Sequence, residues 1–127
     1  MPAAADEIYC LAQNIYFEAR SESLAGKYAV ADVVLNRVRS PKYPSTICGV
    51  IKYRCHFSWY CDGKSDTPKA SGKAWKDSVS IARNILLEKK FLGISDGATH
   101  YHATYVTPFW SVSLQNVGRI GNHIFYR

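Results

Sequence analysis

Long apolar runs, internal repeats and Gly/Ser-rich linkers are all absent from this chain of 127 residues. No stretch approaches the roughly 20 apolar residues of a membrane-spanning helix, so we expect no stable insertion into a membrane. The length fits one modest core and nothing divides the chain. Residues 1–127 are therefore predicted to form a single domain.

Acidic side chains are missing between Asp32 and Asp62, although the whole chain carries a net charge of +6. A stretch that is only basic attracts polyanions such as nucleic acid, anionic lipid or the anionic polymers of a bacterial wall. A solvated basic face without a specific partner is the alternative. The basic residues of this stretch are Arg37, Arg39, Lys42, Lys52 and Arg54.

Zinc-ligand spacings are also missing, because no two cysteines form a C-x-x-C pair. Cys55 and Cys61 flank the sequence His-Phe-Ser-Trp-Tyr, and a disulfide between them would close that loop if the protein works outside the cytoplasm. Cys10 lies on an apolar helical face, where we expect a buried thiol. Cys48 is the remaining cysteine.

Helical periodicity dominates the first two thirds of the chain. It predicts a helix over residues 6–20, a second one that starts after the N-cap Ser23 and ends before Ser40-Pro41, and a third from about Ser71 to Lys90. Pro44-Ser45-Thr46 is expected to open a short helical turn, and residues 53–68 to form a loop with one short strand.

The pattern changes near residue 99, where apolar and polar side chains begin to alternate as in a strand. Pro108 interrupts this pattern, and Gly118, Gly121 and Asn122 provide turn residues before the final residues 123–126. Helices first and short strands last predict an α+β domain. Its helical N-terminal part would be separated by a cleft from a small antiparallel β region near the C-terminus.

Glu18 is the first candidate for chemistry, because it falls about 80° from the centre of the apolar stripe of the first helix. Glu22 lies one turn further on the same flank. A carboxyl at the border of an apolar face is partly desolvated, which raises its pKa and lets it act as an acid near neutral pH. Spacing alone favours the competing interpretation, in which two surface glutamates bond Arg20 or cap the next helix.

Aromatic and histidine side chains are the second candidate group. Rings mixed with polar groups in residues 57–63, and again at Tyr101, Tyr105, Phe109 and Trp110, are typical of a carbohydrate cleft, although they would equally build a small core. The four histidines, His56, His100, His102 and His123, would supply zinc ligands together with an acid or a cysteine. No H-E-x-x-H frame is present, and we predict no metal site and no cofactor.

Several segments, in order along the chain, resemble the SleB-type cell-wall hydrolases, a family of spore cortex-lytic enzymes and related phage and bacterial wall hydrolases. The resemblance covers about residues 7–126. The family pattern usually has Gly where this chain has Ser21. The matching segments are residues 16–22 (Y-F-E-A-R-S-E), 29–38, 57–63, 98–103, 108–110 and 120–126.

This resemblance implies a lytic-transglycosylase-like fold and cleavage of peptidoglycan between N-acetylmuramic acid and N-acetylglucosamine. It places the catalytic acid on Glu18, and we expect His123 to orient it. A lytic transglycosylase needs only that carboxyl and forms 1,6-anhydro-muramic acid, whereas a lysozyme-like hydrolase needs a second one, for which Glu22 and Asp62 are available. The expected sugar-cleft residues are Ser58, Trp59, Tyr60, Tyr101, His102 and Trp110.

Two further readings stay open, a zinc-dependent amidase using His100, His102 and His123, and a basic wall-binding module without activity. We expect peptidoglycan as the partner, no nucleic acid, and a monomer. The residues after Met1 show no secretory signal, so we expect the protein to be made in the cytoplasm and to act on the wall. Small size and the missing leader fit a phage endolysin released by a holin; a bacterial enzyme whose leader was removed fits nearly as well.

Overall fold

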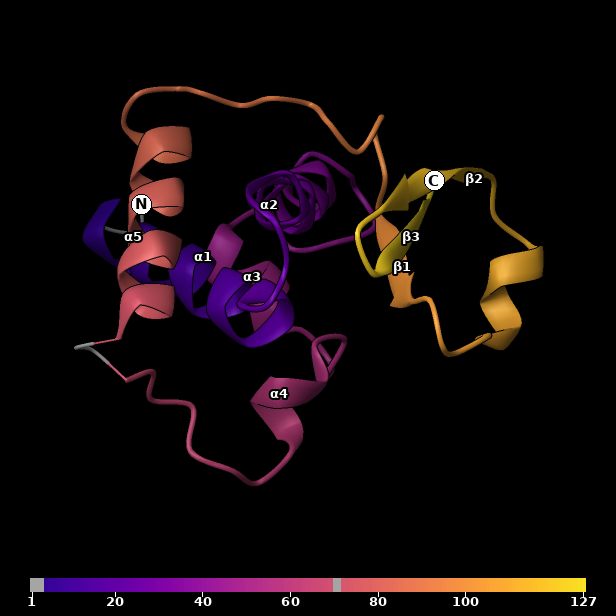
Figure 1. Ribbon diagram of the computed structural model, residues 1–127. Helices are drawn as coiled ribbons and strands as arrows, with labels where there is room; N and C mark the ends of the chain where they lie inside the picture. The colour runs from indigo at the N-terminus through magenta and orange to yellow at the C-terminus, as the bar shows by residue number, and fades with distance from the viewer. Residues whose placement is uncertain (1–3, 70–71) are drawn as a thin grey trace.

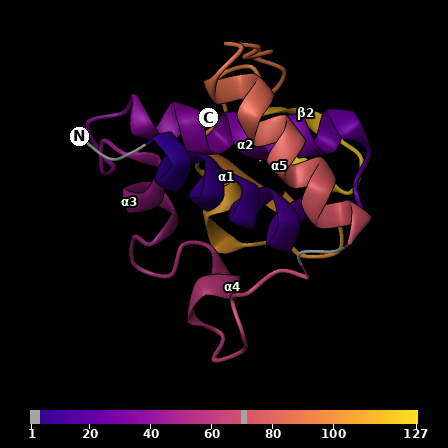
Figure 2. The same cartoon turned by 90° about the vertical axis from the view of Figure 1, so that its left-hand side faces the viewer.

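Helix α1 (Ala4–Ala19) contacts three other helices and carries the centre of the core. The computed structural model describes residues 4–69 and 72–127. Figures 1 and 2 show α5 running along one side of α1, while α2 and α3 lie on its other side. The remaining helices are α2 (Leu24–Val38), α3 (Ile47–Ile51), α4 (Ser58–Cys61) and α5 (Lys73–Leu86).

The helical core forms because the apolar residues of α1 recur at helical spacing and meet those of its neighbours. Leu11 and Ile15 are completely buried, and they share one cluster with Val34 of α2, Val50 of α3 and Ile81 of α5. Among the described residues, no helix is long and apolar enough to cross a membrane.

A small antiparallel sheet closes the other side of α2 (Figure 1). Its strands lie in the order β1-β3-β2, and a short 3-10 helix, η1, follows β1. Phe125, at the centre of β3, is 1% exposed and packs with Ala29 and Val33 of α2. The ranges are β1 His100–Ala103, η1 Phe109–Val112, β2 Asn116–Ile120 and β3 His123–Tyr126.

This architecture confirms the predicted α+β class and the order of its parts. The Oγ atom of Ser23 accepts a hydrogen bond from the Gly26 amide at 3.2 Å and caps α2 as predicted. Thr46 does the same for α3 through the Gly49 amide, at 3.0 Å. A short helical turn therefore follows Pro44-Ser45-Thr46, as the sequence indicated.

Three details of the predicted elements were wrong. The third long helix ends at Leu86 instead of Lys90, because the apolar stripe stops there and Leu87 is 47% exposed; the expected start at Ser71 lies outside the described residues. Residues 53–68 contain helix α4 and no strand. Gly118 belongs to strand β2, at a register shift opposite β3, and does not form a turn.

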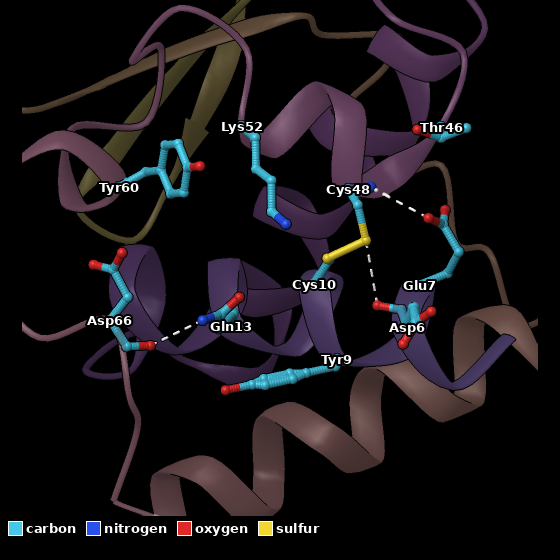
Figure 3. Close-up of a pocket in the computed structure, with 10 residues that line it drawn as sticks. All are labelled: Asp6, Glu7, Tyr9, Cys10, Gln13, Thr46, Cys48, Lys52, Tyr60 and Asp66. Atoms are coloured by element: carbon cyan, nitrogen blue, oxygen red, sulfur yellow. Dashed lines mark hydrogen bonds between the residues drawn. A yellow bond between two sulfur atoms is a disulfide. The ribbon is translucent and has the colours of Figure 1, made fainter. Parts of the chain in front are cut away.

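Cys10 is not a free thiol, which corrects the sequence-based expectation. Its sulfur bonds to Cys48 and joins α1 to α3, as Figure 3 shows. The α1 side chain Glu7 adds a second link, because its carboxylate accepts the Ile47 amide at the start of α3 at 2.8 Å. The bond considered between Cys55 and Cys61 is present and closes the loop around α4.

Replacing both Cys10 and Cys48 by alanine should lower the free energy of unfolding by about 4 kcal/mol, because that bond closes a loop with a sequence separation of 38. The matched Cys55→Ala/Cys61→Ala variant opens a loop with a separation of only 6 and should lose about 2 kcal/mol. Urea unfolding without reductant measures both losses. A larger loss for the short loop would contradict the expectation.

Candidate active site

Glu18 lies in the last turn of α1, where the helical part faces the sheet. The hydroxyl of Tyr101, on β1, donates a hydrogen bond to its carboxylate. The bond joins residues 83 apart in sequence and holds the carboxyl at the junction of the two parts of the fold. The apolar core on the neighbouring face of α1 leaves the carboxyl half-buried.

Burial raises the pKa of Glu18, while the Tyr101 hydrogen bond and the charge of Arg37 act in the opposite direction. Burial also raises the pKa of Tyr101 well above its ordinary value, and the nearby Glu18 charge adds to the rise, so this phenol stays a donor. The net effect is a raised pKa, so Glu18 keeps its proton to a higher pH than an exposed glutamate does, which is the property that a general acid needs.

Three polar side chains of α2 fix the segment that leads into β1. Asp32 accepts a hydrogen bond from the Ser95 amide at 3.1 Å, and Asn36 donates to the Ala98 carbonyl at 2.9 Å. Arg37 donates from Nε to the Thr99 carbonyl at 2.8 Å. These contacts set where β1 begins, and hence where Tyr101 meets Glu18.

Arg37 is 6% exposed, and its guanidinium lies against two aromatic rings. Its Cζ atom lies 5.0 Å from the ring centre of Tyr43 and 5.1 Å from that of Phe57. Burial lowers the pKa of Arg37, but a guanidinium stays charged throughout the usual pH range. The sequence alone identified this residue only as one member of the basic stretch.

Two depressions lie on either side of the Glu18–Tyr101 contact. The larger, of about 410 Å³, includes Glu18 itself, and the smaller, of about 250 Å³, includes Tyr101. Together they follow the boundary between helices and sheet, where the sequence predicted a cleft. The larger is lined by Glu18, Ser21, Glu22, Ala103, Tyr105, Asn122 and His123, and the smaller by Arg37, His56, His100, Tyr101 and Trp110.

Glu22 is already engaged by the turn between β2 and β3. Its carboxylate accepts the Asn122 amide at 2.8 Å and the Asn122 side-chain nitrogen at 3.0 Å, and its side chain is 5% exposed. Burial acts to raise the pKa of Glu22, but these bonds and nearby His123 outweigh it and lower the pKa overall. The second glutamate of the motif therefore stays ionised and holds the hairpin turn against the helices.

Gly121 is required by that contact. Its φ is +59°, and a Cβ atom on it would lie 2.5 Å from Oε1 of Glu22. The neighbouring His123 packs edge-on against Tyr101, with ring centres 4.9 Å apart. His123 therefore contacts the phenol that donates to Glu18, and a role in orienting the acid stays a prediction.

Trp110 packs against two histidines of β1. The Trp110 ring lies 5.1 Å from His100 and 5.8 Å from His102, between ring centres. His102 donates from Nδ1 to the Ala103 carbonyl at 2.7 Å, so its Nε2 accepts the Tyr126 hydroxyl at 2.8 Å. Among the described residues, no group of three or more His, Cys, Asp or Glu side chains is placed to hold a metal ion.

The predicted site residues of the α4 region lie elsewhere. Trp59 is 6% exposed, donates to Asn14 at 2.8 Å and stacks on Phe17 with ring centres 4.8 Å apart. Its ring is part of the core beneath α1, which corrects the expectation that it offers a face to a sugar. Ser58 and Asp62 are exposed, and neither lines a depression beside Glu18.

Tyr60 lines a separate pocket of about 560 Å³ between α1, α3 and α4 (Figure 3). This pocket is larger than either depression beside Glu18, but the acid is not among its lining residues. Cys10, Lys52 and Asp66 contribute to it as well. Of the expected sugar-cleft residues, the structure therefore brings Tyr101 and Trp110 into the cleft and His102 beside it, and leaves the three from α4 outside.

A family model and individual relatives both match most of this chain. Residues 21–126 match the family model described as Cell Wall Hydrolase. The chain is 35% identical over 122 residues to a spore cortex-lytic enzyme of Halalkalibacterium halodurans and 33% identical to that of Bacillus subtilis, covering 94% of this chain in both cases. It spans 34% and 37% of the length of these two enzymes.

Two solved structures share the fold. The catalytic domain of the germination-specific lytic transglycosylase SleB from Bacillus anthracis superposes with a TM-score of 0.76 at 29% identity, covering 96% of this chain and 94% of that one. The catalytic domain of the Bacillus cereus SleB protein gives a TM-score of 0.75 at 29% identity, covering 97% and 91%.

Glu18→Gln should change how stability depends on pH, because the raised pKa of Glu18 lies above its unfolded value. Below the ordinary glutamate pKa of about 4.3, the carboxyl is neutral in both states and the variant resembles the wild type. As the pH rises through that value, the unfolded chain ionises first, so the wild type loses stability that the variant keeps. Urea unfolding at about pH 4 and about pH 8 should show that the free energy of unfolding of the variant, relative to that of the wild type, is higher at the higher pH. A constant difference would contradict this.

Gly121→Ala should lower the free energy of unfolding by about 2–3 kcal/mol, since it combines a strained φ with a collision against Glu22. Gly63→Ala is the matched control: its φ is +77°, but nothing lies within 4 Å of the added Cβ. It should lose only about 1 kcal/mol, the cost of the backbone conformation alone. Thermal or urea unfolding measures both, and equal losses would rule out the collision.

Proposed function

This chain belongs to the cell wall hydrolase family, and we propose that it cleaves peptidoglycan between N-acetylmuramic acid and N-acetylglucosamine as a lytic transglycosylase. The observation that carries the proposal is Glu18, a carboxyl with a raised pKa held by Tyr101 at the edge of a cleft. The likeness to a catalytic domain described as a lytic transglycosylase supports it.

In the first step, neutral Glu18 protonates the glycosidic oxygen while the bond from that oxygen to the anomeric carbon of muramic acid breaks. In the second step, ionised Glu18 takes the proton from the C6 hydroxyl of the same sugar. The C6 oxygen attacks the anomeric carbon and closes the 1,6-anhydro ring, so no water is consumed and the acid is regenerated. The donor hydroxyl of Tyr101 and the charge of Arg37 stabilise the ionised form between the steps.

The geometry favours this route over hydrolysis, which needs a second carboxylate across the scissile bond. Both oxygens of Glu22 are held by Asn122, and a carboxylate fixed in that way is poorly placed to activate water. Asp62 lies on the exposed loop after α4, where its Oδ1 accepts the Lys64 amide at 2.9 Å. Neither candidate is a free carboxylate in the cleft.

The disulfides support a place of action outside the cytoplasm. Disulfides such as Cys10–Cys48 and Cys55–Cys61 persist in an oxidising compartment, so we propose that the protein acts on the wall outside the cytoplasm. We also propose that it acts as a monomer and does not bind nucleic acid. Release by a phage holin and export with a leader would both bring the protein to the wall. His102 and Trp110 remain our proposed sugar contacts, and His123 our proposed support for Tyr101.

Glu18→Gln should reduce cleavage of purified peptidoglycan by about a thousandfold, because glutamine can neither give nor take the proton. Glu88→Gln, at an exposed position after α5, is the matched control and should cleave like the wild type. Mass spectrometry of the soluble products measures both the yield and the chemistry. Products ending in 1,6-anhydro-muramic acid, lost only with Glu18→Gln, are expected.

Other products identify the alternatives. Reducing-end muramic acid would mean hydrolysis and would require a second carboxylate. Free peptides with intact glycan, lost on adding a chelator, would mean a zinc-dependent amidase. Tight, salt-sensitive binding of the wall without any product would mean a basic binding module.

A further inference from the structure

The smaller depression beside Tyr101 has a cation at its base. We call it the Arg37 pocket, and its lining residues are Arg37, His56, His100, Tyr101 and Trp110. Arg37 is the only one of them with a permanent charge. In the proposed mechanism the charge of Arg37 stabilises ionised Glu18, but that role does not require Arg37 to line a pocket of its own, so the pocket calls for a separate explanation.

The Arg37 guanidinium has fewer hydrogen bonds than its burial requires. Its Nε atom is used by the Thr99 carbonyl, but Nη1 is buried and has no hydrogen-bond partner among residues 4–69 and 72–127. Buried polar groups are almost always paired, so the unpaired Nη1 leaves part of the hydrogen-bonding capacity of this guanidinium unused. The rings of Tyr43 and Phe57 hold the guanidinium plane but accept no conventional hydrogen bond.

The electrostatic surroundings determine what kind of partner fits. Arg37 acts on both pocket histidines, Arg54 acts on His56 and Lys42 acts on His100, while the carboxylate that acts on Arg37 is Glu18. His56 and His100 are neutral near neutral pH, because burial and these cations lower the pKa of each. The field in the pocket is therefore positive, which favours a carboxylate and disfavours an ammonium group.

The pocket is also next to the reacting bond. Tyr101 lines the pocket and donates to Glu18. A group bound in the pocket therefore belongs to one of the sugars next to the glycosidic oxygen that Glu18 protonates. In a glycan strand of alternating sugars, only muramic acid carries a substituent that ends in carboxylates. Trp110, packed against His100, provides an apolar wall for the carbon atoms of that substituent.

We propose that the Arg37 pocket binds a carboxylate carried by the muramic acid substituent and so selects the bond that is cleaved. This inference rests on the proposed glycan-strand cleavage and adds a specificity-determining role for Arg37. The carboxylate has two sources: the lactyl group of a muramic acid without peptide, and the peptide attached to that group. Both would accept hydrogen bonds from the guanidinium, and the substrates below separate them.

The test compares glycan strands on the wild-type enzyme. One set is freed of peptides, which exposes the lactyl carboxylates, and a second set has those carboxylates converted to neutral methylamides. The carboxylate strands should be cleaved with a kcat/KM about tenfold or more above that of the methylamide strands, as expected for a charge-assisted hydrogen bond. Strands that keep their peptides identify the source. If they are cleaved as fast as the carboxylate strands, the pocket takes either carboxylate; if they alone are fast, it takes the peptide carboxylate; if they are slow, it takes the lactyl carboxylate alone.

Variants show whether Arg37 causes the preference. Arg37→Gln should bring the ratio of the two kcat/KM values close to one, and Arg37→Lys should keep part of it, since the charge remains and the planar fork is lost. Arg39→Gln is the matched control, because Arg39 is exposed and lies over Phe91 at 4.3 Å; it should keep the wild-type ratio. A purely structural role for Arg37 would lower both rates and leave their ratio unchanged.

Each outcome has one meaning. Equal cleavage of the carboxylate, methylamide and peptide-bearing strands by the wild type overturns the carboxylate pocket but leaves the proposed function intact. Cleavage of none of the strands, nor of whole peptidoglycan, overturns the proposed function instead. The wild-type comparison needs no variant, so it decides the question even if Arg37→Gln does not fold.

Discussion

The hydrogen bond from Tyr101 to Glu18 is the contact on which the geometry of the cleft depends. It is the point where a helix end meets a strand, so its position depends on how the sheet is attached to the helices. Helix α2 attaches the sheet through two kinds of contact, apolar packing and hydrogen bonds. Its apolar residues pack against Phe125 of the sheet, while Asn36 and Arg37 bind the carbonyls just before β1. A shift of that segment would move the phenol away from the carboxyl.

The two glutamates of the motif illustrate how the environment assigns roles to identical side chains. Glu18 and Glu22 are separated by one helical turn in sequence, yet their pKa values shift in opposite directions. Burial dominates at Glu18, where the Tyr101 hydroxyl donates to the carboxylate. Burial also acts to raise the pKa of Glu22, but the backbone and side-chain donors of Asn122, together with His123, outweigh it and keep this carboxylate ionised. One carboxyl is left able to exchange a proton, and the other holds the β2–β3 turn in place.

The arginines of the basic stretch between Asp32 and Asp62 lie in different environments once the chain is folded. Arg37 is inside, between Tyr43 and Phe57, whereas Arg39 and Arg54 lie over single rings at exposed positions. A run of charge that suggested a continuous surface for polyanions therefore contributes one cation to the cleft. The Cys55–Cys61 bond supports this arrangement, because the loop that it closes carries Phe57.

The sequence by itself determined the three long helices and the α+β class, and its resemblance to a known family pointed to Glu18 as the expected acid. Periodicity and capping are local, so Ser23 and Thr46 could be recognised as helix starts, and the motif around Glu18 was visible as a string of letters. Only the tertiary structure decided which residues surround that acid. Tyr101 is 83 residues from Glu18, and the partner of Cys10 is 38 residues away, so no local pattern joins them. Trp59 was misplaced for the same reason: whether an aromatic ring is part of the core or faces a sugar depends on what packs against it, and that is decided by contacts between distant segments.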